Sequence, residues 1–101
     1  MSENSHEAVS HAVKEVEHPE ISRTLDELGM IRDVTTDGAH VRITLAVPFP
    51  TIPILGLLTD LLRQAVLSVE SDADVQIEVA EMTSEERERF LRMASEGWKL
   101  G

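Results

Sequence analysis

The chain has 101 residues, of which 42% are apolar and 28% are charged. That balance is typical of a single globular domain and argues against a disordered chain. There are 19 acidic and 9 basic residues, so the formal net charge is −10. Because nucleic acids and anionic membranes are themselves negative, this charge disfavours either of them as a partner.

The sequence contains no cysteine. The chain alone therefore cannot form a disulfide, bind zinc or an iron–sulfur cluster through thiolates, or act through a nucleophilic thiol. Its first residues are polar and acidic, unlike a signal peptide, and no apolar run approaches the ~18 residues that a membrane span needs. We expect a cytoplasmic protein.

A first helix is expected over residues 5–17, after a flexible start at 1–4. Apolar residues recur there every three or four positions and define one face. Asn4 and Glu7 have the spacing of a capping box, and Pro19 disfavours helical geometry at the residue before it.

A helical turn at 24–28 and a β-hairpin are expected next. Gly29 suits the C-terminal cap of that turn. Two β-rich segments follow at 30–36 and 40–47, and Asp37-Gly38 between them predicts a type I′ turn. Apolar residues alternate with others in the second segment, so one face of this strand should be buried and the other wet.

The second half begins with a proline-rich loop at 48–53, which should be stiff because each proline fixes its φ angle. A helix over 54–69 follows, and its wide leucine-rich face predicts that it is the central core helix. A third strand is expected at 75–79. The pair Thr83–Glu86 forms a second capping box before a charged helix at 84–95.

The predicted element order is α-β-β-α-β-α. It indicates an α+β, two-layer domain in which helices cover a small three-stranded sheet. The helix between the second and third strands permits these two strands to pair in parallel. We expect one domain over residues 1–101, with flexible ends at 1–4 and 96–101.

Four segments carry a resemblance to a known family: HPEI at 18–21, LDELGMIRDV at 25–34, TIP at 51–53 and EVAEMT at 78–83. The residues of these segments, and the distances between the segments, resemble those of the iron–sulfur cluster assembly domain. That domain stands at the N-terminus of Mrp-type P-loop ATPases and alone in SufT-like and PaaD-like proteins. The resemblance covers about residues 7–92. It implies this fold and a role in cluster assembly.

The chain departs from the usual family pattern at two motifs. It has His18-Pro19-Glu20 where the family usually has Asp-Pro-Glu, so only the first acidic residue is lost. The family loop usually reads Thr-x-x-Gly-Cys-Pro, and here Ile52 stands at the cysteine position while Pro53 is kept. Isoleucine has no lone pair to give a metal. The resemblance therefore implies the pathway without cluster ligation through this loop.

The loop at 48–53 supports two interpretations. Phe49 and Ile52 among stiff prolines can form an apolar ridge that docks on a partner, or both can fold inward as a plug of the core. Trp98, in a short tail, either covers the sheet or anchors a partner. The candidate partner-binding residues are Glu20, Glu27, Phe49, Pro50, Thr51, Ile52, Pro53 and Trp98.

Carboxylates and histidines are the candidate metal or acid–base groups of this sequence. The resemblance places Glu20 and Glu27 near the loop as a possible pair, although capping and surface charge also explain them. His18 with Glu20 makes at most a two-ligand fragment, fewer than a structural zinc site takes. The remaining histidines, His6, His11 and His40, lack the spacing of shared ligands. The sequence predicts no metal site.

Three hypotheses about function remain open. The first is a non-enzymatic accessory of iron–sulfur cluster assembly or metalloenzyme maturation, which binds a Mrp-type carrier ATPase, a scaffold or a client apoprotein. The second is a metal-carrying protein with carboxylate and histidine ligands. The third is an enzyme, but no glycine-rich phosphate loop, nucleophile–base set or cofactor fingerprint occurs. We predict the first, without enzymatic activity and without a resident cofactor.

Overall fold

The structure, a computed structural model, describes residues 2–49 and 52–97. The elements follow in the order α1 (Ser2–Lys14), β1 (Ile31–Asp37), β2 (His40–Val47), α2 (Leu55–Val69), β3 (Asp74–Glu81) and α3 (Ser84–Gly97). This is the predicted α-β-β-α-β-α order, and the α+β fold class is confirmed.

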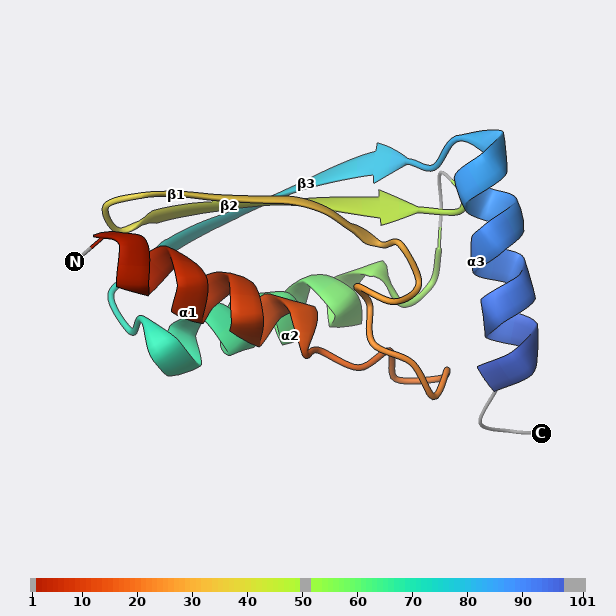
Figure 1. Ribbon diagram of the computed structural model, residues 1–101, viewed down its shortest axis with the longest axis horizontal. Helices are drawn as coiled ribbons and strands as arrows, with labels where there is room; N and C mark the ends of the chain where they lie inside the picture. The colour runs from red at the N-terminus through yellow and green to blue at the C-terminus, as the bar shows by residue number, and fades with distance from the viewer. Residues whose placement is uncertain (1, 50–51, 98–101) are drawn as a thin grey trace.

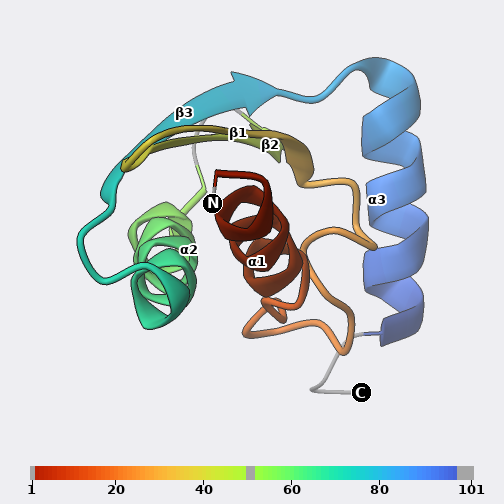
Figure 2. The ribbon, with the colours of Figure 1, turned by 60° about the vertical axis from the view of Figure 1, so that its left-hand side comes forward.

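The three strands form one sheet in the order β1-β2-β3. β1 pairs antiparallel with β2, and β2 pairs in parallel with β3 through the crossover helix α2. Figures 1 and 2 show α1 and α2 side by side against one face of the sheet, while α3 stands across its end. No helix among the described residues covers the opposite face, where Arg42 lies 3.6 Å from Glu78.

The core lies between the sheet and the two helices α1 and α2. The side chains that fill it are almost all aliphatic, as the scarcity of aromatic residues requires, and each contributes about 1.5–3 kcal/mol when fully buried. Its almost completely buried members include Val9, Val13, Ile21, Leu25, Leu28, Met30, Val41, Ile43, Leu45, Val47, Leu58, Leu62 and Val66. Within residues 2–49 and 52–97, no helix is long and apolar enough to cross a membrane.

The first helix is displaced from its predicted position. It begins at Ser2, so Asn4 lies inside the helix and does not cap it, and it ends at Lys14. The chain leaves the helix early because the Val16 carbonyl accepts the Leu25 N–H at 2.8 Å, and the His18 N–H reaches the Arg23 carbonyl at 2.9 Å. Pairing within the connector, residues 15–30 between α1 and β1, thus replaces the last predicted helical turn.

The hairpin turn also differs from the prediction. Asp37 pairs with His40, so the turn residues are Gly38 and Ala39. Gly38 has φ +61°. Within the described chain, every residue with a positive φ is a glycine, so Ala39 has a negative φ. A positive φ at the first turn position alone is the pattern of a type II′ turn, which requires glycine there. The predicted type I′ turn at Asp37-Gly38 is wrong.

The connector and the remaining elements agree more closely with the sequence. The predicted turn at 24–28 is confirmed, because the Leu28 N–H donates to the Thr24 carbonyl at 3.1 Å and Gly29 adopts φ +78° after it. α2 begins one residue later than predicted, with Ile54 as its N-cap residue. β3 and α3 both extend beyond their predicted ends.

Candidate functional site

An apolar pocket of about 310 Å³ opens between the loop after β2 and the helix α3. Its wall is formed by segments that are far apart in sequence: the turn after α1, the loop after β2, the approach to α2, and α3. The lining residues are His18, Glu20, Ile21, Met30, Pro48, Phe49, Ile52, Pro53, Ile54, Phe90, Leu91 and Ala94. Such a concave apolar site with few polar groups is the usual form of a binding site.

The loop after β2 forms one wall of this pocket, and its apolar side chains differ in how far they are exposed. Pro48 is buried, and Phe49 beside it keeps 46% of its surface exposed. Ile52 is half-buried against the core, and its carbonyl accepts the Leu55 N–H at 3.2 Å. The loop is therefore neither a free ridge nor a simple plug, because one apolar side chain points outward and another packs inward.

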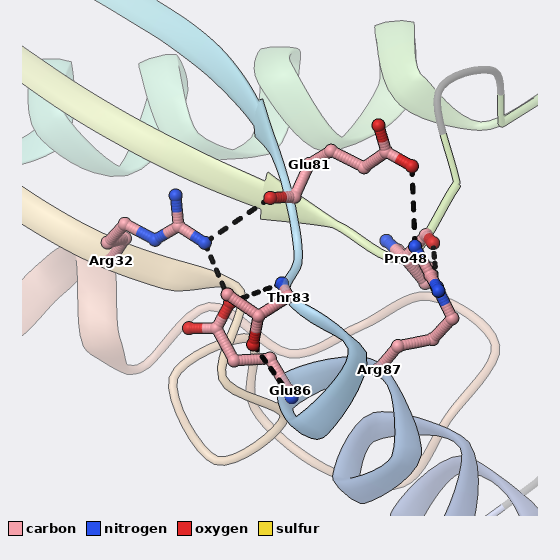
Figure 3. A network of polar contacts seen from close by, with 6 residues as sticks. All are labelled: Arg32, Pro48, Glu81, Thr83, Glu86 and Arg87. Atoms are coloured by element: carbon pink, nitrogen blue, oxygen red, sulfur yellow. Dashed lines mark hydrogen bonds and ion pairs between the residues drawn. The ribbon is translucent and has the colours of Figure 1, made fainter.

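Arg87 of α3 holds the start of the loop in place, as Figure 3 shows. Its Nε donates to the Pro48 carbonyl at 2.7 Å, and its Nη2 lies 3.3 Å from Glu81 Oε2. The guanidinium carbon is also 5.7 Å from the centre of the Phe49 ring, within the range of a cation–π contact. One side chain thus fixes both the backbone and the aromatic ring of the loop.

The first turn of α3 is anchored by the predicted capping box. The Thr83 N–H donates to Glu86 Oε1 at 2.8 Å, and the Glu86 N–H donates to Thr83 Oγ1 at 3.2 Å. Arg32 donates to the same Glu86 oxygen at 2.7 Å (Figure 3). The Thr83 N–H, and then Arg32, lower the pKa of Glu86 below its ordinary value of 4.5.

Arg32 reaches α3 because β1 contains a bulge. Ile31 pairs with Leu45 and Asp33 pairs with Thr44, so Arg32 is the extra residue in the ladder. A bulge redirects the side chain of its extra residue. Here it contributes to holding α3 across the end of the sheet.

The turn after α1 places Glu20 at the edge of the pocket. His18 is buried, with 4% exposure, and its Nδ1 accepts the Glu20 N–H at 3.0 Å. A short acidic side chain would make the same bond in an Asx turn. His18 therefore stabilises the turn that carries Glu20.

Glu27, in contrast, does not line the pocket. Its Oε1 accepts the Thr24 N–H at 2.9 Å, and the Glu27 N–H donates to Thr24 Oγ1 at 3.1 Å. These bonds, chiefly the backbone one, lower the pKa of Glu27, and the charge of Arg23 adds to the effect. Glu27 thus caps the turn at 24–28 in a box that the sequence analysis did not identify.

The structure brings together four of the predicted site residues, namely Glu20, Phe49, Ile52 and Pro53. Pro50, Thr51 and Trp98 lie outside the described residues. The sequence analysis missed the contribution of α3, where Phe90 and Ala94 are buried and Leu91 is 46% exposed. Their spacing of three and four residues could have indicated an apolar face, but the charged residues around them made this face hard to recognise.

The histidines are dispersed over the described structure. His6 Nδ1 lies 2.8 Å from Thr36 Oγ1, His11 faces Glu15 at 3.1 Å, and His40 faces Asp74 at 3.2 Å. Within the described ranges, no three or more His, Cys, Asp or Glu side chains are grouped so that they could hold a metal ion.

Comparisons with known proteins agree with this architecture. The profile of a family described as "Iron-sulfur cluster assembly protein" matches residues 6–79. An "Iron-sulfur cluster carrier protein" of Synechocystis sp. is 30% identical over 81 residues, which are 80% of this chain and 23% of that relative. The crystal structure of a domain of unknown function, DUF59, from Bacillus anthracis superposes with a TM-score of 0.66 at 23% identity, covering 92% of this chain and 90% of the other. This chain belongs to the iron–sulfur cluster assembly protein family.

Proposed function

We propose that this protein is a non-enzymatic accessory of iron–sulfur cluster assembly or metalloenzyme maturation that acts by docking on another protein. The docking surface is the pocket between the loop at 48–53 and α3, with Phe49 and Leu91 on its rim and Glu20 at its edge. Pro50, Thr51 and Trp98 are further candidates for this surface. Glu27 takes part indirectly, since it caps the connector that follows Glu20.

One observation carries the proposal, which is the pair of large apolar side chains on the two sides of the pocket. Phe49 and Leu91 each keep 46% of their surface exposed although both line a concave site. Removing such surface from water is worth about 25 cal/mol per Å². Apolar anchors that fill pockets dominate the energetics of protein interfaces.

The chemistry of the loop favours docking over cluster ligation. The chain has no cysteine, and Ile52 stands where the resemblance places the family's thiolate. The chain spans 23% of the carrier relative, so it corresponds to one part of that protein. We infer that it works with a separate partner, namely a Mrp-type carrier ATPase, a scaffold or a client apoprotein. The cytoplasm is the proposed compartment, since this chain belongs to an iron–sulfur cluster assembly family.

The test uses two side chains of equal exposure. Phe49 and Leu57 are both 46% exposed, but Leu57 lies on α2 and does not line the pocket. We expect Phe49→Ser to weaken binding to the purified carrier ATPase, scaffold or client by about tenfold or more in interferometry. Leu57→Ser should bind as the unaltered chain does. If both variants bind alike, the pocket is not the docking surface.

A metal-carrying protein is the second candidate, because His18 and Glu20 line the same pocket. Nδ1 of His18 is already occupied by the Glu20 N–H. This alternative predicts stoichiometric iron or zinc in the purified protein, lost when His18 and Glu20 are both replaced.

A further inference from the structure

The free edge of β3 lies apart from the apolar pocket, none of whose described lining residues belongs to this strand. We propose that this edge binds an extended, basic segment of a partner protein as an additional strand of the sheet. Strand addition joins two chains through main-chain hydrogen bonds, while alternate side chains provide specificity. The proposal does not depend on the pocket as a docking surface.

Every second residue of β3 can form main-chain hydrogen bonds with an added strand. β3 stands at one end of the order β1-β2-β3, so only one of its sides is paired within the described chain. The Asp74 N–H donates to the Ala39 carbonyl at 2.8 Å, and the Met82 N–H donates to the Val47 carbonyl at 2.8 Å. Because main-chain groups of successive residues point to opposite sides of a strand, the even-numbered residues bond to β2. The odd-numbered residues from 75 to 79 therefore direct their N–H and C=O groups toward the open side.

The two edges of the sheet differ in how they are protected. β1, at the other edge, contains the bulge at Arg32, and α1 contacts this strand, with His6 Nδ1 2.8 Å from Thr36 Oγ1. Bulges, prolines, lysines and covering helices are the usual means by which proteins prevent pairing at an edge. β3 has eight residues, none of them proline, lysine or arginine, and it pairs with β2 in continuous register from Asp74 to Glu81. This edge is therefore long, regular and open to another strand.

The side chains of β3 define what the added strand should carry. On the face toward the core, Val75 and Ile77 are half-buried, whereas Val79 keeps 46% of its surface exposed. An apolar side chain beside Val79 would remove that surface from water. Gln76 and Glu78 alternate with these residues and lie on the opposite face. An added strand with the same alternation places apolar residues toward the core and polar residues on the outer face.

The charge around β3 selects a basic segment. No lysine or arginine occurs from residue 64 to residue 86, whereas acidic residues stand before, within and after the strand. Glu78 lies 3.6 Å from Arg42, and Asp74 lies 3.2 Å from His40, but all four side chains are more than half exposed. Asp72, just before β3, has no ion-pair partner within residues 2–49 and 52–97. A second copy of the chain would bring an equally acidic strand, so charge favours a basic partner over self-pairing.

A labelled synthetic peptide as long as β3, in which valine alternates with lysine and threonine, tests the proposal by fluorescence polarisation. We expect this peptide to bind, and a peptide with glutamate in place of lysine to bind about tenfold more weakly. Val79→Lys puts a cation on the pairing edge and should weaken binding of the basic peptide about tenfold. Leu57→Lys makes the same change of charge at the same 46% exposure, but on α2, and should leave the affinity unchanged. No binding, equal affinities for the two peptides, or equal effects of the two substitutions would overturn the proposal.

N-methylated peptides test the main-chain pairing and need no substitution in the protein. Only every second amide of an added strand faces β3, so methylating one alternate set should abolish binding while methylating the other set retains it. Equal binding of the two methylated peptides would contradict strand addition. Sedimentation tests the other occupant, because a dimer of the unaltered chain that Val79→Lys dissociates would assign the edge to a second copy and refute the basic partner.

Discussion

Arg87 on α3 donates through Nε to the carbonyl oxygen of Pro48 at 2.7 Å, and so joins two segments that are 39 residues apart in sequence. The carbonyl belongs to the first residue after β2, and the donor belongs to a helix beyond the residues 6–79 that the family profile matches. Three of the pocket's lining residues, Phe90, Leu91 and Ala94, therefore come from a part of the chain that the profile does not match.

Replacing Arg87 tests this clamp. Arg87→Leu keeps an apolar stem but leaves the Pro48 carbonyl without its donor, so we expect the free energy of unfolding in urea to fall by about 1–2 kcal/mol. Glu81→Gln is the control, because it removes only the exposed contact between Glu81 and Arg87, and such pairs contribute about 0–1 kcal/mol. Equal losses in both variants would show that the carbonyl bond adds nothing.

His18 provides a test of the turn that carries Glu20. His18→Ala removes the acceptor of the Glu20 N–H and leaves a void at a site that is 4% exposed, so we expect about 2 kcal/mol of destabilisation. His18→Asn supplies an amide oxygen that can accept the same N–H in an Asx turn, and it should recover most of the loss. If Asn is as damaging as Ala in urea unfolding, the hydrogen bond is not what the histidine provides.

Glu86 should contribute to the pH dependence of the free energy of unfolding. The Thr83 N–H and Arg32 lower the pKa of this carboxyl in the folded state from 4.5. Its contribution is therefore complete above that value and is lost as the pH falls through the lower, folded-state pKa. In Glu86→Gln, which can still cap the helix, the unfolding free energy should change less steeply with pH below 4.5.

Glu85→Gln is the matched control for that measurement. Glu85 lies in the same helical turn, and its carboxylate makes no hydrogen bond or ion pair with the rest of the described chain. Urea unfolding followed at several acidic pH values should give the control the slope of the unaltered chain. A slope in Glu86→Gln that equals this control would contradict the role of the capping box.

The sequence predicted those features that depend on local signals. Element order follows from hydrophobic periodicity, and the Thr83–Glu86 box follows from two residues at capping distance. The parallel pairing of β2 with β3 was permitted by the length of the crossover. The end of α1 was missed because the Leu25 N–H bonds to Val16, a contact that depends on the tertiary position of the connector.

Only part of the candidate site could be predicted from the sequence, for the same reason. Glu20, Phe49, Ile52 and Pro53 could be selected from the resemblance and from the composition of one loop. The opposite wall comes from α3, whose charged residues conceal the apolar positions around Leu91 when the sequence is considered without its packing partner. Glu27 was paired with Glu20 because the resemblance places both near the loop, yet the Glu27 carboxylate accepts the Thr24 N–H instead.

We propose above all that this chain contributes a docking surface and no cluster ligand of its own. We would reconstitute the protein anaerobically with iron and sulfide, without added thiol, and measure bound iron and visible absorption after desalting. Ile52→Cys restores a thiol at the family position and serves as the positive comparison, with Leu57→Cys as the control for a thiol elsewhere. We predict that the unaltered chain stays colourless and iron-free while Ile52→Cys retains iron. Stoichiometric iron with cluster absorption in the unaltered chain would contradict the claim.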